Sequence, residues 1–299
     1  ISYVRDYDVY AYDLAADKEL AVTTGGTEEK THGLAEFVAQ EEMDRHTGYW
    51  WSPDSKSIAF TEADHAGVEV WYLADPLKPD VAPRKQYYPR PGKKNVSVRL
   101  GIRKLSGGET VWVDWDRKKY EYLASVKWDK IGGLTVQLQT RDQHELELSR
   151  VKPELGERSV LLRDTDPAWL NLKQGMPRWI DENQFLWLSD RSGDQMAELV
   201  DVVKEKREAI SPKNLPIEDI VDVVSGINKS LSPIYRGSDN PTRMYLWNGS
   251  DLRGTRRTLT QVAPDLGGGV LNLVTTSDLS TRVYSFTAAD CMPTWSVQT

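Results

Sequence analysis

The sequence predicts an all-β protein of the irregular β-propeller class, built from small sheets that follow one another along the chain. Short strand-like runs recur, separated by Gly, Pro, Asn and Asp turn residues. The 11 Trp and 13 Tyr residues favour strands, because aromatic side chains pack well on a pleated surface. The runs form units of about 40 to 60 residues, the range of propeller blades. Radial stacking of small sheets explains this recurrence more simply than an unrelated multi-sheet β protein, which is the alternative.

The first half of the chain carries the clearest strand patterns. Residues 1–14 predict two strands joined by a tight turn at Asp6-Tyr7-Asp8. Residues 96–104 alternate strictly, as a half-buried strand does. The prolines between positions 76 and 91 predict a loop around Gln86-Tyr87-Tyr88. The other strands predicted here are residues 57–62, which we expect to pair with residues 68–73, and residues 111–116, 122–128 and 134–140.

The second half repeats this rhythm. Residues 176–188 and 197–203 predict a pair of strands with a turn at Asp190-Arg191-Ser192-Gly193. Trp179-Ile180-Asp181-Glu182 resembles Trp51-Ser52-Pro53-Asp54, and we interpret both as repeat markers. Further strands are predicted at residues 217–224, 231–236, 243–247, 270–275 and 281–286. This grouping gives about five to six blades.

One short helix is predicted within residues 33–60, and it ends on the adjacent acids Glu41 and Glu42. Leu34, Phe37 and Val38 share one face at helical spacing. Two carboxylates beside the aromatic run Tyr49-Trp50-Trp51 suit the binding of one cation. Two neighbouring glutamates are also typical of a solvated helix face, and side chains at i and i+1 diverge by about 100° on a regular helix.

The order helix, Glu-Glu, Gly-Tyr-Trp-Trp and Ser-Pro-Asp resembles the glutamate-pair segment of the dipeptidyl peptidase IV family. That segment lies in the N-terminal β-propeller of the family. Residues 88–95 are similar to a further loop of the same propeller, and residues 122–128 and 169–194 resemble its following blades. The resemblance implies an eight-bladed ring, of which this chain would be a partial N-terminal propeller domain over residues 1–299.

The resemblance also implies a function for the acids. Glu41 and Glu42 would bind the α-ammonium of a peptide substrate, and the parent enzyme would release N-terminal dipeptides ending in Pro or Ala. In a supporting role, Arg45 would orient the pair or partly neutralise it, and Asp44 would steady Arg45. Arg45 also lies at i+4 from Glu41, where a modest surface ion pair could account for it. Tyr49 is expected to pack in the core rather than line the pocket.

No catalytic or metal-binding residue is predicted in this chain. The family's peptidase activity needs a Ser-Asp-His triad on an α/β-hydrolase domain, and no G-x-S-x-G motif occurs here. We therefore expect the chain to be inactive alone. All four histidines have polar sequence neighbours and are expected at the surface. A single cysteine excludes Cys-rich zinc sites and an intramolecular disulfide, and no cofactor motif is present.

Composition and charge narrow the range of possible partners. The net charge of −7 gives no reason to expect nucleic-acid binding, and no apolar run is long enough to span a membrane. The chain starts within a predicted strand and without Met, so we expect a portion of a longer protein, either periplasmic or cytoplasmic. The expected partners are a peptide substrate, the protein's own hydrolase domain and a second copy covering exposed strand edges. The alternative function is a propeller that serves as a non-catalytic interaction module or scaffold.

Overall fold

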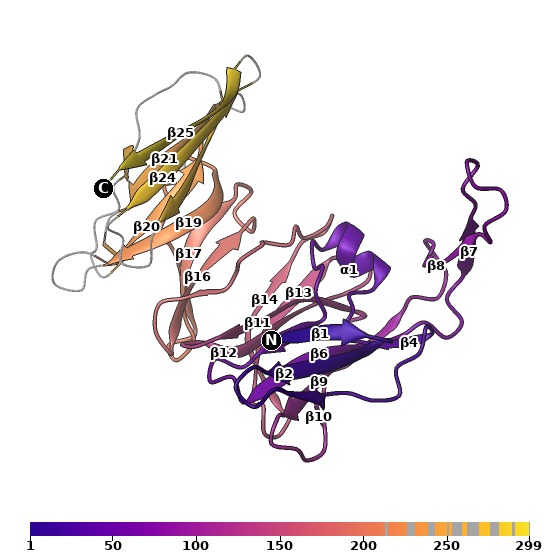
Figure 1. Ribbon diagram of the computed structural model, residues 1–299. Coiled ribbons are helices and arrows are strands. Elements are labelled where there is room, and N and C mark those ends of the chain that lie inside the picture. The colour runs from indigo at the N-terminus through magenta and orange to yellow at the C-terminus, as the bar shows by residue number, and fades with distance from the viewer. Residues whose placement is uncertain are drawn as a thin grey trace. The chain divides into compact units, whose positions relative to one another are not determined.

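The computed structural model describes residues 1–212, 215–225, 231–238, 243–249, 251–252, 259–261, 269–275, 281–288 and 291–298. It divides into two compact units, residues 1–174 and residues 175–299. Almost all of the regular structure is β, in successive antiparallel sheets, and the one helix described is α1, Phe37–Glu42 (Figure 1). The predicted all-β class and the predicted helix at Glu41 and Glu42 are confirmed.

The first unit contains three sheets and one separate hairpin. The first sheet has the order β1-β2-β3, and the predicted turn at residues 6–8 is confirmed by the positive φ of Asp6 and Tyr7. The second has the order β10-β9-β6-β4, with β5 also paired to β6, and the third has the order β11-β12-β13-β14. The strands are β1 Ser2–Arg5, β2 Asp8–Asp13, β3 Lys18–Ala21, β4 Lys30–His32, β5 Tyr49–Trp51, β6 Ser57–Asp64, β9 Ser97–Lys104, β10 Val111–Trp112, β11 Tyr122–Asp129, β12 Gly133–Gln139, β13 Glu145–Val151 and β14 Arg158–Thr165.

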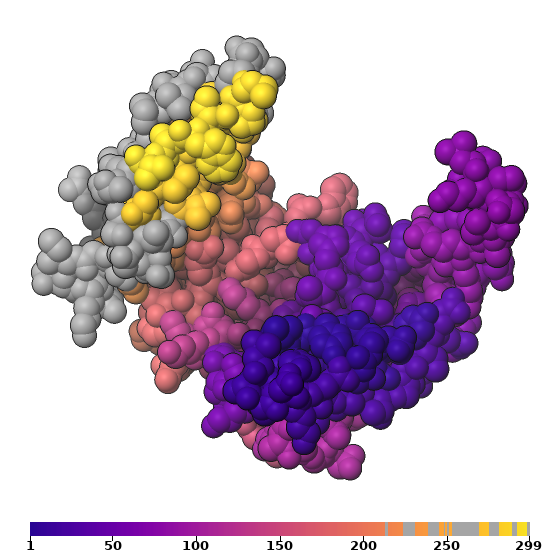
Figure 2. Space-filling model, viewed as in Figure 1, coloured from indigo at the N-terminus to yellow at the C-terminus, as the bar shows by residue number. Residues whose placement is uncertain are grey.

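The separate hairpin corrects one predicted pairing. Residues 68–73 were expected to pair with residues 57–62, but β7 (Val70–Leu73) pairs with β8 (Arg84–Tyr87), which lies in the predicted proline loop. Besides β4 and β5, β6 pairs with β9, in a register that joins Asp64 to Ser97. The β7–β8 arm therefore leaves the second sheet after β6 and returns to it at β9. Figure 2 shows the arm standing away from the rest of the first unit.

The core of the first unit lies between its sheets. Apolar side chains of β6 and β9 pack against those of β11 and β12, for example Leu100 against the group of Leu123, Leu134 and Leu138. A second cluster joins β2 to β5 and β6 through Val9, Ile58 and Phe60, with Tyr49 packed against it. Each sheet thus covers a face of the next one, as the stacking argument from the sequence requires.

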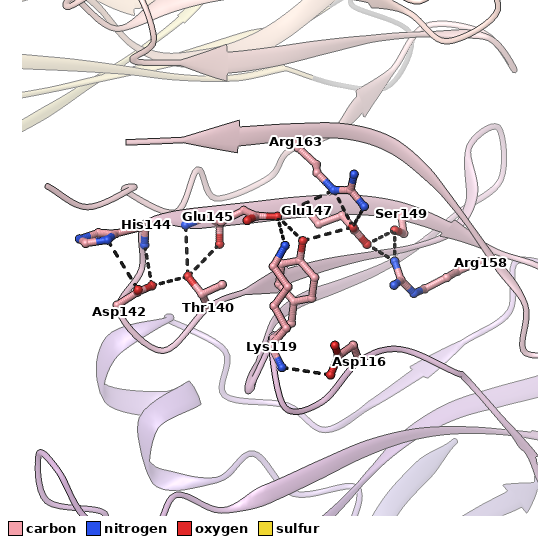
Figure 3. Close-up of polar contacts among 11 residues, drawn as sticks. Asp116, Lys119, Thr140, Asp142, His144, Glu145, Glu147, Ser149, Arg158 and Arg163 are labelled. Atoms are coloured by element: carbon pink, nitrogen blue, oxygen red, sulfur yellow. Dashed lines mark hydrogen bonds and ion pairs between the residues drawn. The ribbon is translucent and has the colours of Figure 1, made fainter. Parts of the chain in front are cut away.

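The third sheet also holds a buried charge. Glu147 on β13 is wholly buried, and Figure 3 shows Arg158 and Arg163 reaching it from β14. Arg163 donates to one carboxylate oxygen through Nε at 3.0 Å and Nη2 at 2.8 Å, and Ser149 donates to the other at 2.9 Å. The strand β13 is an interior strand of its sheet, and the carboxylate that it carries is satisfied rather than solvated.

The second unit contains two further sheets. One has the order β15-β16-β17-β18, and the other is seven-stranded with the order β19-β20-β21-β23-β24-β25 and β22 paired to β21. The strands β21 and β23 pair in parallel, so two successive antiparallel groups are joined there. The strands are β15 Arg178–Trp179, β16 Gln184–Ser189, β17 Met196–Asp201, β18 Lys206–Ala209, β19 Ile217–Ser225, β20 Leu231–Gly237, β21 Arg243–Gly249, β22 Leu259–Gln261, β23 Gly269–Thr275, β24 Arg282–Ala288 and β25 Cys291–Gln298.

Candidate functional site

The helix α1 places the two candidate acids on a short, exposed turn. It spans six residues, of which only Ala39 is buried, and both Glu41 and Glu42 are exposed. It begins at Phe37, later than the apolar spacing predicts, because Leu34 forms an isolated bridge with Thr47 instead. The helix ends at Glu42, and the next residue, Met43, is buried and holds the chain in place beside the two acids.

Glu41 and Glu42 face different neighbours. Glu41 lines a hollow of about 850 Å³ between α1 and the β7–β8 arm, with Phe37, Trp71 and Tyr88 among its walls. Glu42 lies near Tyr122: burial raises the pKa of the Tyr122 phenol, Arg141 opposes this, and the carboxylates of Glu121 and Glu42 raise it further. The divergence of adjacent helical side chains is thus visible in the structure.

The aromatic wall of this hollow connects α1 to the arm. Phe37 packs on Tyr88 with ring centroids 4.9 Å apart, and Tyr88 stacks on Trp71 of β7 at 4.3 Å. The strand pairing explains why α1 and the arm lie close together. The start of β5, which follows α1, and the end of β6, which leads into the arm, lie at the same end of the second sheet because these strands are antiparallel. Aromatic pairs of this kind contribute about 0.5–1.5 kcal/mol beyond their buried area.

Arg45 has a different partner from the one expected. Its Nη2 donates to both carboxylate oxygens of Glu36, at 2.9 and 2.8 Å, and both side chains are 5% exposed. The structure shows no ion pair from Arg45 to Glu41 or Glu42, because the helix ends at Glu42 and Arg45 is no longer on its surface. No pattern in the sequence pointed to Glu36, which lies one residue before the helix.

The other two supporting residues also contact groups that were not expected. Asp44 is exposed and pairs with His46 at 3.0 Å, so the structure does not show it steadying Arg45. Tyr49 is half-buried against the core cluster and donates to the Ser2 carbonyl at 3.3 Å. Tyr49 therefore has the packing role that its position at the start of a strand indicated.

Two of the four histidines are buried, which corrects the expectation that all lie at the surface. His32 bridges Asp8 at 2.7 Å and Glu62 at 3.3 Å. Burial raises the pKa of Asp8, but hydrogen bonds from Thr23, His32 and a backbone amide outweigh it and leave that pKa below its ordinary value. His65 lies in the hollow that Glu41 lines, and burial lowers its pKa.

The residues described offer no group of three or more His, Cys, Asp or Glu side chains arranged to hold a metal ion. The helix in the described part of the chain is also too short to cross a membrane. What the site presents is a pair of exposed carboxylates, one of them beside an aromatic hollow. Such a site can bind a cation through charge-assisted hydrogen bonds.

Comparison with known proteins decides the family. A sequence profile described as "Dipeptidyl peptidase IV (DPP IV) N-terminal region" matches residues 1–247. The chain belongs to the dipeptidyl peptidase IV family. It is 19% identical to the crystal structure of Porphyromonas gingivalis dipeptidyl peptidase 4, with a TM-score of 0.81 over 99% of this chain and 41% of that one. That likeness confirms the predicted propeller-type fold.

Curated relatives match a smaller part of the chain. Mouse dipeptidyl peptidase 8 is 26% identical over 184 residues, which are 52% of this chain and 21% of that protein. The probable dipeptidyl-aminopeptidase B of Emericella nidulans is 24% identical over 200 residues, 59% of this chain and 22% of that protein. Mouse inactive dipeptidyl peptidase 10 is 27% identical over 182 residues, 58% of this chain and 23% of that protein. The matches thus span about a fifth of each relative's length, within the N-terminal propeller region of the family.

Proposed function

We propose that this chain is the substrate-binding and gating propeller of a dipeptidyl peptidase, and that Glu41 and Glu42 bind the α-ammonium of a peptide. The observation that carries the proposal is the presentation of both carboxylates at the end of α1, exposed and available to a ligand. An ammonium group has three donors, so two carboxylates from different sides can share it. Because Glu41 lines the hollow and Glu42 lies near Tyr122, a shared ammonium would have to be held above the end of the helix, between the two carboxylates.

The acids would act by positioning. The chemistry would belong to the hydrolase domain of the full-length protein, and the propeller would fix how far the peptide enters. Anchoring the amino group about two residues from the scissile bond selects dipeptide release, with Pro or Ala as the second residue. Binding energy away from the reacting bond is used here to orient the substrate.

The test is a Glu41→Ala and Glu42→Ala double substitution in the full-length protein. Each charge-assisted hydrogen bond is worth about 1.5–3 kcal/mol before solvent screening, so we expect kcat/KM for a dipeptidyl anilide to fall at least about a hundredfold. A matched control is Glu154→Ala, which removes an exposed carboxylate from the turn between β13 and β14. Equal kinetics in the double variant and the control would refute the role of the acids.

The second candidate is a non-catalytic interaction module, and one relative, named an inactive dipeptidyl peptidase, favours considering it. An active full-length protein excludes this candidate directly. A full-length protein that binds a dipeptide at Glu41 and Glu42 without cleaving it would support a module that has kept the ammonium site.

The proposed second copy of the chain would contact the β7–β8 arm. The arm is a two-stranded hairpin that exposes Trp71, Tyr72, Leu73, Leu77 and Val81, and Leu77 is 90% exposed. An isolated hairpin with this much exposed apolar surface gains stability from a partner. We expect Tyr72→Glu with Leu77→Glu to convert a dimer to a monomer in sedimentation equilibrium. A wild-type chain that is already monomeric at micromolar concentration would overturn the dimer.

A further inference from the structure

By its length, capping and charge, α1 is an unfavourable helix, so contacts from the rest of the chain must stabilise it. Its six residues are too few for a helix to be stable by itself. Its first residue has no side-chain cap, and its last turn contains two acids and no base. Carboxylates at a helix C-terminus oppose the helix dipole. The direction of Glu41 and Glu42 therefore depends on contacts from outside the helix.

The strongest such contact joins the two ends of the helix to each other. Glu36 immediately precedes α1 and Arg45 follows it, and the guanidinium of Arg45 donates to both oxygens of the Glu36 carboxylate. Both side chains are 5% exposed, so the pair is poorly screened by water. Arg45 also donates to the Thr47 carbonyl at 3.3 Å. The ion pair thus closes a loop whose contents are the helix and its two acids.

Hydrogen bonds to backbone carbonyls hold both ends of the helix within the segment that this ion pair closes. The amide of Arg45 donates to the Ala39 carbonyl at 2.9 Å, and the side chain of Gln174 donates to the Met43 carbonyl at 2.8 Å. At the start of the helix, Gln40 donates to the Ala35 carbonyl at 2.6 Å. These bonds are single and neutral, and each is weaker than the charged pair.

We propose that Arg45, through its ion pair with Glu36, is a positioning residue that sets the direction of Glu41 and Glu42. The inference rests on the proposed ammonium role of the two acids. Arg45 touches neither acid, and it would act by fixing the chain on both sides of them. We call the Arg45–Glu36 ion pair the clasp. If the clasp breaks, the last turn of α1 loses the contact that stabilises it against the unfavourable position of its two acids, and the two carboxylates no longer point to one ligand.

The kinetic test compares three variants of the full-length protein. Arg45→Lys keeps the charge but loses the forked geometry. Glu36→Gln with Arg45→Met removes both charges, so that neither is left buried and unpaired. Arg158→Lys is the matched control, because Arg158 also pairs with a buried glutamate of the first unit but contacts Glu147 rather than Glu36.

We expect KM for an aminoacyl-prolyl anilide to rise about tenfold in Arg45→Lys and in the double variant, with kcat nearly unchanged. The des-amino analogue has no ammonium to anchor, so its kcat/KM should not change. The control should leave both substrates as in the wild type. A purely structural role for Arg45 predicts instead that both substrates lose rate in proportion to the folded fraction, and this result would overturn the proposal.

Hydrogen exchange on the chain itself separates this inference from the ammonium role. We expect the amides of residues 40–45 to exchange at least about tenfold faster in Arg45→Lys than in the wild type, and to stay protected in Arg158→Lys. If Glu41→Ala with Glu42→Ala lowers activity while Arg45→Lys changes neither exchange nor KM, the clasp is refuted and the ammonium site stands. If exchange rises in Arg45→Lys but the glutamate variant keeps full activity, the clasp holds the helix and its proposed purpose is refuted.

Discussion

The buried carboxylate of Glu147 gives the sharpest prediction about stability. Glu147→Gln keeps the shape of the side chain and removes its charge. In the wild type two arginines donate to this carboxylate, and Ser149 donates a further hydrogen bond (Figure 3). The amide of Gln offers one acceptor oxygen and places an NH₂ group against the donors of one arginine.

The size of the effect follows from burial. Removing one partner of a buried ion pair costs about 3–5 kcal/mol. Glu147 is 0% exposed and Arg158 18%, but Arg163 is 55% exposed, so part of its interaction is screened and the lower end applies. A loss of about 3 kcal/mol in a folding unit of this size lowers Tm by about 6 to 12 °C.

Differential scanning calorimetry of the chain measures this shift. The control is Glu145→Gln on the same strand, whose carboxylate pairs with Lys119 at 2.8 Å and is 22% exposed. We expect that variant to lose less than about 1 kcal/mol. If Glu147→Gln lowers Tm no more than Glu145→Gln does, the buried pair is not stabilising the sheet and the reasoning fails.

Three further predictions concern the first unit. Gly156→Ala should destabilise the chain by more than about 2 kcal/mol in urea unfolding, because φ is +72° and the new Cβ would lie 2.1 Å from the Trp112 carbonyl, whereas Gly133→Ala, at φ +73° with open space, should cost only about 1 kcal/mol. Leu138→Ala should cost about 2–5 kcal/mol by the same measurement, because this side chain is fully buried between sheets. Burial lowers the pKa of His65 below its ordinary value of 6.5, so the unfolded chain is protonated first and stability falls as the pH drops below about 6.5; His65→Phe should remove this loss between about pH 7 and pH 5, and an unchanged pH dependence would contradict it.

Local patterns in the sequence predicted local structure well. The alternation at residues 96–104 and the paired runs around Gly133 correspond to β9, β11 and β12. The apolar spacing before Glu41 correctly placed the helix, although its first turn is missing. These features depend on neighbours along the chain, and periodicity reports such neighbours directly.

Partners distant in sequence were not predictable in this way. The run at residues 68–73 indicated a strand but did not identify its true partner. The prolines that suggested a loop instead border β8, the second strand of the arm. The burial of His32 depends on Asp8 and Glu62, which reach it from other strands. Polar sequence neighbours say little about such a histidine, because burial is decided by the packing of sheets.

Arg45 shows why the site itself was harder to predict than the fold. Spacing rules for a helix paired Arg45 with Glu41, but they apply only while the helix continues. Since α1 ends at Glu42, Arg45 returns toward the start of the helix and meets Glu36. A rule for helix surfaces thus gave the right residue and the wrong partner.

The end of α1 at Glu42 also matters for function. A sequence that satisfied every local preference would place bases, not Glu41 and Glu42, in the last turn of α1. Local rules are broken chiefly where a site needs the unfavourable arrangement, and the surrounding structure must then offset the cost. In this chain the buried ion pair that spans the one described helix offsets the cost of its last turn. The exposed acids themselves make no evident contribution to the fold. Glu41→Gln with Glu42→Gln should therefore raise the unfolding free energy slightly in urea unfolding, because the carboxylates oppose the helix dipole at this end, and a lower unfolding free energy would contradict this.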